Sequence, residues 1–147
     1  MPKQSYQFFR MVNQGHEEFL EKPWLPIRFT NPANGEFITI NGLVDSGADT
    51  CLFPASLCQC VGHKLRADGV KSNRALGVEQ KPVRTWRHTF SLELLSPDMT
   101  KVLWKTSKDM EFDCSEAEPP VLLGVDDFLR HFKVTLDYQQ GLVTLEW

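Results

Sequence analysis

The sequence predicts one mostly β domain with one or two short helices. Its 147 residues fit a single domain, and a hydrophobic content of 41% is ordinary for a globular protein. Apolar and polar residues alternate in several segments, most clearly in 86–94, which is typical of half-buried strands. Turn clusters such as Asn-Pro-Ala-Asn-Gly at 31–35 separate these segments.

The first 22 residues mix aromatic and polar side chains, and Pro23 and Pro26 interrupt the chain after them. They contain no apolar stretch of the signal-peptide kind. We therefore expect an N-terminal leader or extension at 1–22, packed on the body of the protein or on a partner chain. The folded domain is expected at 23–147.

The domain is expected to open with a β-hairpin. Residues 25–30 alternate apolar and polar side chains, the cluster at 31–35 forms the turn, and 37–44 forms the second strand. This second strand leads directly into Asp45.

A short helix and a projecting hairpin are expected in the middle of the chain. Pro54 suits the first position of a helix, which would run over 55–61 and stop at Gly62. The arms of a hairpin at 74–83 are too polar to be buried, so this hairpin should project. Further strands are expected around 102–104 and 110–114.

The C-terminal part begins with a short apolar run, Val121-Leu122-Leu123-Gly124, of the kind that is buried on both faces. Asp126 or Asp127 is expected to cap a short helix at 128–131. A terminal hairpin follows, with its turn at 139–141.

Charge and hydropathy exclude several classes of partner. The formal net charge of −3 argues against a nucleic-acid surface and against electrostatic membrane binding. No run approaches the roughly 18 apolar residues of a membrane helix. A cytoplasmic location is the expectation.

Ordinary structural explanations suffice for the four cysteines and for His88, which lies on the apolar face of the strand expected at 86–94. Reduced, partly buried thiols are expected for all four cysteines, which are Cys51, Cys58, Cys60 and Cys114. A zinc site with Cys58, Cys60, His63 and another cysteine is an alternative, but it lacks the paired spacing of structural zinc sites. His88 is expected to be a core residue.

Five acidic residues lie close together in the sequence. A solvated strand face and loop would explain this run, and a preference for basic substrate side chains is the alternative. The run comprises Asp109, Glu111, Asp113, Glu116 and Glu118.

The segment from Gly42 to Thr50 carries the strongest chemical signal. Asp45 follows apolar strand residues and precedes Ser46 and Gly47. A carboxylate at the end of a buried strand is costly, so a catalytic role would explain it. An ordinary turn is the competing interpretation, because Asp, Ser and Gly favour turns.

Two motifs in order resemble the retropepsin-like family of aspartic proteases, of the cellular or bacterial type. Leu43-Val44-Asp45-Ser46-Gly47-Ala48-Asp49 resembles the family's apolar-apolar-Asp-Thr/Ser-Gly-Ala signature. Val121 to Gly124, followed by Asp127-Phe128-Leu129, resembles its downstream apolar-apolar-Gly segment. The resemblance covers about Trp24 to Tyr138, and it implies a closed retropepsin-like β-barrel, the acid protease fold.

The resemblance also implies an aspartic endopeptidase that works as a homodimer. Two Asp45 carboxylates would meet on the two-fold axis and activate a water. Support for this active site would come from Ser46, Gly47 and Gly124. An extended peptide or protein substrate would contact Ala48, Asp49, Leu76, Gly77 and Val78. No metal and no organic cofactor is implied.

Some features depart from the retroviral pattern and favour an alternative. Val125 stands where retroviral enzymes carry an arginine that pairs with the acid at the position of Asp49. The projecting hairpin has Gly77 as its one glycine. A catalytically inactive dimerisation or peptide-binding module of the same fold is therefore the second hypothesis.

Overall fold

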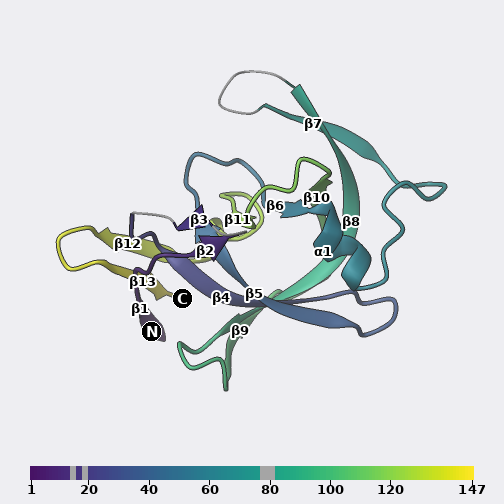
Figure 1. Cartoon of the computed structure of the whole chain (residues 1–147). Coiled ribbons are helices and arrows are strands. Elements are labelled where there is room, and N and C mark those ends of the chain that lie inside the picture. Colours follow the sequence, from purple (N-terminus) through teal and green to yellow (C-terminus); the bar gives the residue numbers. More distant parts are fainter. Residues whose placement is uncertain (14–15, 18–19, 77–81) are drawn as a thin grey trace.

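Strands dominate the structure, as the sequence predicts. The computed structural model describes residues 1–13, 16–17, 20–76 and 82–147 (Figure 1). The strands are β1 (Lys3–Gln7), β2 (Val12–Asn13), β3 (His16–Glu17), β4 (Trp24–Thr30), β5 (Phe37–Val44), β6 (Leu52–Pro54), β7 (Ser72–Leu76), β8 (Pro82–Leu95), β9 (Val102–Lys105), β10 (Met110–Ser115), β11 (Leu122–Leu123), β12 (Lys133–Asp137) and β13 (Leu142–Glu146). The helices are α1 (Ala55–Cys60) and the 3₁₀ turn η1 (Leu129–His131).

The larger sheet contains the strands that carry both sequence motifs. Its order is β10-β6-β11-β5-β4-β8-β7, with β9 paired to β8. β10 also pairs with β8, so hydrogen-bonded pairings lead from β10 through β6, β11, β5 and β4 to β8 and back. The predicted hairpin of β4 and β5 is confirmed, with Ile27 opposite Ile40. Closure of this sheet into a barrel stays a prediction.

A smaller sheet joins the two ends of the chain. β1 pairs antiparallel with β13, and β12 and β13 form the predicted terminal hairpin. Tyr6 is buried, and its hydroxyl donates a hydrogen bond to the Leu95 carbonyl at 2.7 Å. Residues 3–8 thus pack against the body, while the division of the chain at residue 22 stays a prediction.

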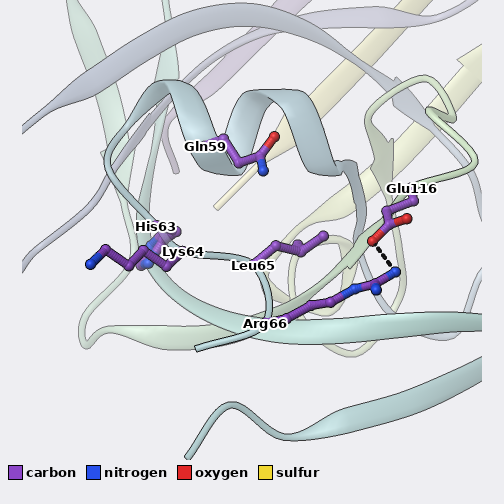
Figure 2. A pocket seen from close by; sticks show the side chains of 6 residues that line it. All are labelled: Gln59, His63, Lys64, Leu65, Arg66 and Glu116. Atoms are coloured by element: carbon purple, nitrogen blue, oxygen red, sulfur yellow. Dashed lines mark ion pairs between the residues drawn. The ribbon is translucent and has the colours of Figure 1, made fainter. Parts of the chain in front are cut away.

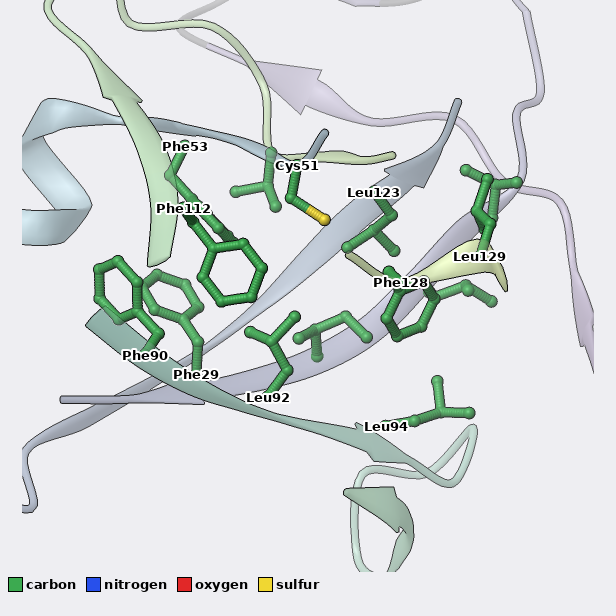
Figure 3. Close-up of a cluster of buried hydrophobic side chains, with 14 of the residues drawn as sticks. Phe29, Cys51, Phe53, Phe90, Leu92, Leu94, Phe112, Leu123, Phe128 and Leu129 are labelled. Carbon is green, nitrogen blue, oxygen red and sulfur yellow. The ribbon is translucent and has the colours of Figure 1, made fainter. Parts of the chain in front are cut away.

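The core is built around four phenylalanines (Figure 3). Phe29, Phe53, Phe90 and Phe112 are all fully buried, and the ring centroids of Phe29 and Phe53 are 4.9 Å apart. Full burial of each ring stabilises the fold by about 1.5–3 kcal/mol. Phe53 lies in β6, two residues after Cys51, so this packing fixes the point where the Asp45 loop rejoins the sheet.

The first predicted helix is confirmed and the second differs in detail. α1 follows Pro54, and the side chain of Asn31 donates to the Val61 carbonyl at the end of the helix, at 2.8 Å. η1 is a single 3₁₀ turn whose N-cap is Phe128. The prediction that Asp126 or Asp127 caps it is wrong, because the Asp127 carboxylate accepts a hydrogen bond from the Cys51 amide instead.

The prediction of four reduced cysteines is wrong for two of them. Cys58 of α1 and Cys114 of β10 form a disulfide, 56 residues apart in the chain. Cys51 is buried and free, and burial raises the pKa of its thiol. Cys60 is free and exposed. In the described residues no group of three ligating side chains could hold a metal ion.

His88 is a core histidine, as predicted. It is 5% exposed, and its Nε2 donates a hydrogen bond to the Leu65 carbonyl at 3.0 Å. Its ring lies against His63, with centroids 4.7 Å apart.

No helix in the described part of the chain has the length and apolar character needed to cross a membrane.

Candidate active site

Asp45 lies where β5 ends and a tight loop begins. Its amide donates to the Leu123 carbonyl at 3.2 Å, which fixes the main chain at this point. Its Oδ1 accepts a hydrogen bond from the Gly47 amide at 3.0 Å, and its carbonyl accepts one from the Ala48 amide at 3.2 Å. The partly exposed carboxylate is therefore oriented by the backbone of its own loop.

The two sequence motifs lie side by side. β11 pairs parallel with β5, with Leu122 opposite Leu43 and Leu123 opposite Val44. This pairing brings Gly124 against the backbone of Thr50, where an added Cβ would collide with main-chain atoms. Only glycine fits here, because the atoms that a Cβ would meet belong to the main chain and cannot move aside as the end of a flexible side chain could.

The remainder of the loop is held by main-chain hydrogen bonds. The Val125 amide donates to the Ala48 carbonyl at 2.9 Å, and the Asp126 amide donates to the Asp49 carbonyl at 2.8 Å. The Asp49 side chain is exposed and has no hydrogen bond or ion pair within the described part of the chain. Val125 thus contributes to holding this loop through its backbone.

Ser46 and Gly47 form the exposed turn of the loop. Ala48 and Asp49 follow on the same loop, and Gly124 lies behind Thr50. The structure therefore brings together six of the nine site residues expected from the sequence: Asp45, Ser46, Gly47, Ala48, Asp49 and Gly124. The functional roles expected for them stay predictions.

Leu76, a further expected site residue, belongs to the projecting hairpin. β7 and the start of β8 form this hairpin, which extends away from the body at the top of Figure 1. Leu76 ends β7, opposite Pro82. Gly77 and Val78 lie outside the described residues.

Sequence reasoning missed two buried carboxylates behind the loop. Asp113 and Asp127 are 5% and 7% exposed. Asp113 Oδ2 accepts a hydrogen bond from the Thr50 hydroxyl at 3.3 Å, and Asp127 Oδ2 accepts one from the Cys51 amide at 2.8 Å. Burial raises the pKa of Asp127, and the Cys51 hydrogen bond and the Arg87 charge oppose that rise. Asp127 lies within the second motif, which is the signal that the sequence offered for it, whereas no local pattern marks Asp113.

Most acids of the 109–118 run are engaged with groups of the same chain. Glu116 forms an ion pair with Arg66 at 2.5 Å. Glu118 accepts hydrogen bonds from the Ser56 amide at 3.0 Å and the Ser56 hydroxyl at 2.6 Å. These interactions leave less negative charge free to bind basic side chains. They therefore give no support to a preference for basic substrates.

An open hollow of about 530 Å³ lies beside α1 (Figure 2). The residues that line it are Gln59, His63, Lys64, Leu65, Arg66 and Glu116. The Arg66 guanidinium also stacks over the Trp86 ring, 4.6 Å from its centroid. None of these residues belongs to the Asp45 loop, so the hollow is a separate surface feature.

Comparison with solved structures identifies the fold. A crystal structure of a retropepsin-like aspartic protease from Rickettsia conorii matches with a TM-score of 0.57 and 17% identity. That match covers 98% of this chain and 91% of the Rickettsia chain. The chain has a retropepsin-like fold. The resemblance expected from the two motifs is thus confirmed at the level of the fold.

A second solved structure matches with a lower TM-score. EIAV protease complexed with the inhibitor HBY-793 is 16% identical with a TM-score of 0.46, over 74% of this chain and 86% of that one. No protein-family model and no curated protein matches the sequence.

Proposed function

We propose that the protein is an aspartic endopeptidase that acts as a homodimer. The observation that carries this proposal is the position of Asp45 at the start of an ordered loop in a retropepsin-like fold. Each chain supplies one Asp-Ser-Gly segment, and peptide hydrolysis by carboxylates needs two acids. A second copy of the chain would therefore complete the site.

The two Asp45 carboxylates would share one proton, because like charges about 3 Å apart cannot both ionise. The anionic carboxylate takes a proton from the attacking water. The protonated one donates to the carbonyl oxygen of the scissile bond. Positioned acid and base groups contribute about 10²–10⁴-fold each. The titration belongs to the pair and not to either residue.

The neighbouring residues have supporting roles in this proposal. Ser46 hydrogen-bonds across the two-fold axis, and Gly47 lets the two loops approach. Ala48 and Asp49 contact the backbone of an extended peptide, over which Leu76, Gly77 and Val78 close. Gly124 supports the loop from behind. The mechanism uses no metal and no organic cofactor.

A cytoplasmic location stays a prediction. The disulfide between Cys58 and Cys114 bears on it, because such bonds are rare in cytosolic proteins.

An inactive dimerisation or peptide-binding module is the second candidate. Two observations favour it: Val125 replaces the arginine of the retroviral pattern, and Asp49 has no side-chain partner in the described residues. A binding module has no need for an oriented carboxylate, so the position of Asp45 favours the enzyme.

Cleavage of a peptide library at pH 4–6 tests the two candidates. We expect wild-type cleavage that pepstatin inhibits, and a loss of at least about 10³-fold in Asp45→Asn. Fold and dimer should be intact in that variant. Asp68→Asn, at an exposed acid, is the matched control. No pepstatin-sensitive cleavage by the wild type at any pH would refute the enzyme, and monomer alone by sedimentation at micromolar concentration would refute the shared pair.

A further inference from the structure

An ion pair between a partly exposed arginine and a buried carboxylate lies behind the Asp45 loop and contacts the loop through one side chain. Asp113 in β10 and Arg87 in β8 are cross-strand neighbours, and Arg87 Nε lies 3.7 Å from Asp113 Oδ1. Asp113 is 5% exposed, and its other oxygen accepts the hydrogen bond from the Thr50 hydroxyl. The pair thus connects the middle of the larger sheet to the loop.

This ion pair is a poor choice for stability alone. Arg87 Nε and Asp113 Oδ1 are both buried without a hydrogen bond in the described part of the chain. Arg87 is partly exposed, and its Nη2 donates to the Glu111 carbonyl at 3.2 Å, so the cost of burial falls mainly on Asp113. A buried carboxylate with incomplete hydrogen bonding is often no more stabilising than an apolar residue of similar volume. A role beyond stability would explain why charged residues occupy these positions.

Thr50 is the point through which the pair reaches the loop. Among residues 46–50, Thr50 is the one whose side chain forms a hydrogen bond with the described part of the body. The other fixed points of the loop are main-chain bonds at Asp45, Ala48 and Asp49. Directly after Thr50, the Cys51 amide is held by the second buried acid, Asp127.

We infer that Arg87 and Asp113 are positioning residues, which hold the Thr50 hydroxyl and thereby fix the orientation of the Asp45 carboxylate. This inference rests on the proposed proteolytic function. A displacement of about 1 Å in a reacting group can cost on the order of 10²-fold in rate. Loss of the Thr50–Asp113 hydrogen bond at the far end of the loop should therefore lower the rate.

Thr50→Val removes the hydroxyl and keeps the shape of the side chain, so the fold should survive. We expect kcat for a peptide substrate to fall about tenfold or more, with KM within about twofold. Thr50→Ser restores the hydroxyl and should restore kcat. Asp113→Asn keeps an oxygen acceptor and removes the charge, and we expect kcat between those of the wild type and Thr50→Val.

A matched control is available elsewhere in the chain. The Thr100 hydroxyl donates to Asp98 Oδ1 at 2.7 Å in an exposed turn. Thr100→Val deletes the same kind of hydrogen bond away from the loop. We expect its kcat to equal that of the wild type.

Amide hydrogen exchange in the dimer separates this inference from the proposed function. The Gly47 amide, which donates to Asp45 Oδ1, should exchange about tenfold faster in Thr50→Val and at the wild-type rate in Thr50→Ser. Unchanged exchange in Thr50→Val would overturn the positioning role, as would faster exchange with unchanged kcat. A wild type that cleaves nothing would refute the protease, while the Gly47 exchange rate would still decide whether Thr50 orders the loop.

Discussion

The Asp45 loop and the hairpin of β7 and β8 are built in opposite ways. The loop is held at nearly every residue: by Leu123, Val125 and Asp126 through the main chain, and by Asp113 and Asp127 through buried carboxylates. The hairpin is an exposed pair of strands whose described side chains at 72–74 and 82–84 have little burial.

This contrast would separate two tasks of the proposed active site. Reacting groups gain rate from fixed geometry, which requires many constraints on a short segment. A segment with few buried contacts opens at low free-energy cost. Such opening would suit the binding and release of the extended peptide in the proposed function. Substitutions in the loop should therefore have large effects, and those in the hairpin small ones.

Gly124→Ala should have the largest effect, because its Cβ would collide with the Thr50 backbone. We expect a loss of about 3 kcal/mol in the free energy of unfolding, measured by urea denaturation. Gly69→Ala is the control: its Cβ meets no atom within 4 Å, and only its positive φ of +83° adds strain, at about 1 kcal/mol. Equal losses in the two variants would contradict the close approach of β11 and the loop.

Asp127→Ala should cost about 2 kcal/mol, because the buried Cys51 amide loses its acceptor. The matched control is Asp137→Ala, which deletes a partly exposed carboxylate that accepts from the Gln140 amide at 2.9 Å. Water replaces that bond, so the control should lose well under half as much. Thermal unfolding of both variants at pH 7 measures the difference.

The free energy of unfolding should fall in acid, because two histidines pack together beside β8. Burial lowers the pKa of His63 and of His88, and their mutual repulsion lowers the pKa of His88 further. The unfolded chain therefore binds protons more readily, and stability should fall as the pH drops below about 6.5, the unperturbed value. We expect a lower urea midpoint at pH 5 than at pH 7.5.

The double variant His63→Gln/His88→Gln is the test of that assignment. Without the two imidazoles, the decline between pH 7.5 and pH 5 should shrink. A decline as steep as that of the wild type would assign it to other groups.

The smallest effect is expected within the hairpin. Arg74 and Arg84 are cross-strand partners, and like charges opposite one another are unfavourable. Arg74→Glu should stabilise the protein by about 0.5 kcal/mol or less, read from the thermal midpoint. The double variant Arg74→Glu/Arg84→Glu again places like charges opposite one another and should remove this gain in stability.

Local patterns were enough to predict much of the fold and the front of the site. Alternation and turn residues predict the β4–β5 hairpin that delivers Asp45, and the short apolar run predicts β11. Gly124 could be expected near the loop only through the family resemblance. These features depend on neighbours in sequence or on a motif of fixed order.

The back of the site depends on contacts that no local pattern contains. Asp113 alternates with Phe112 and Cys114, so it would be expected to face water. It is buried instead, with the Thr50 hydroxyl and the Arg87 guanidinium against its carboxylate. The Cys58–Cys114 disulfide and the use of Asp127 as an acceptor for Cys51 also join distant segments. Such pairings become visible only when the chain is folded.

The parallel pairing of β5 with β11 has a consequence for the order of folding. Leu43 and Leu122 lie far apart in the sequence, and contacts of long separation form late because a large loop must close first. The Asp45 loop therefore acquires its Leu123 and Asp126 hydrogen bonds only after most of the chain has been synthesised. A nascent chain that ends before β11 has the Asp-Ser-Gly sequence without the hydrogen bonds that hold it, so the proposed protease would be inactive until β11 is made.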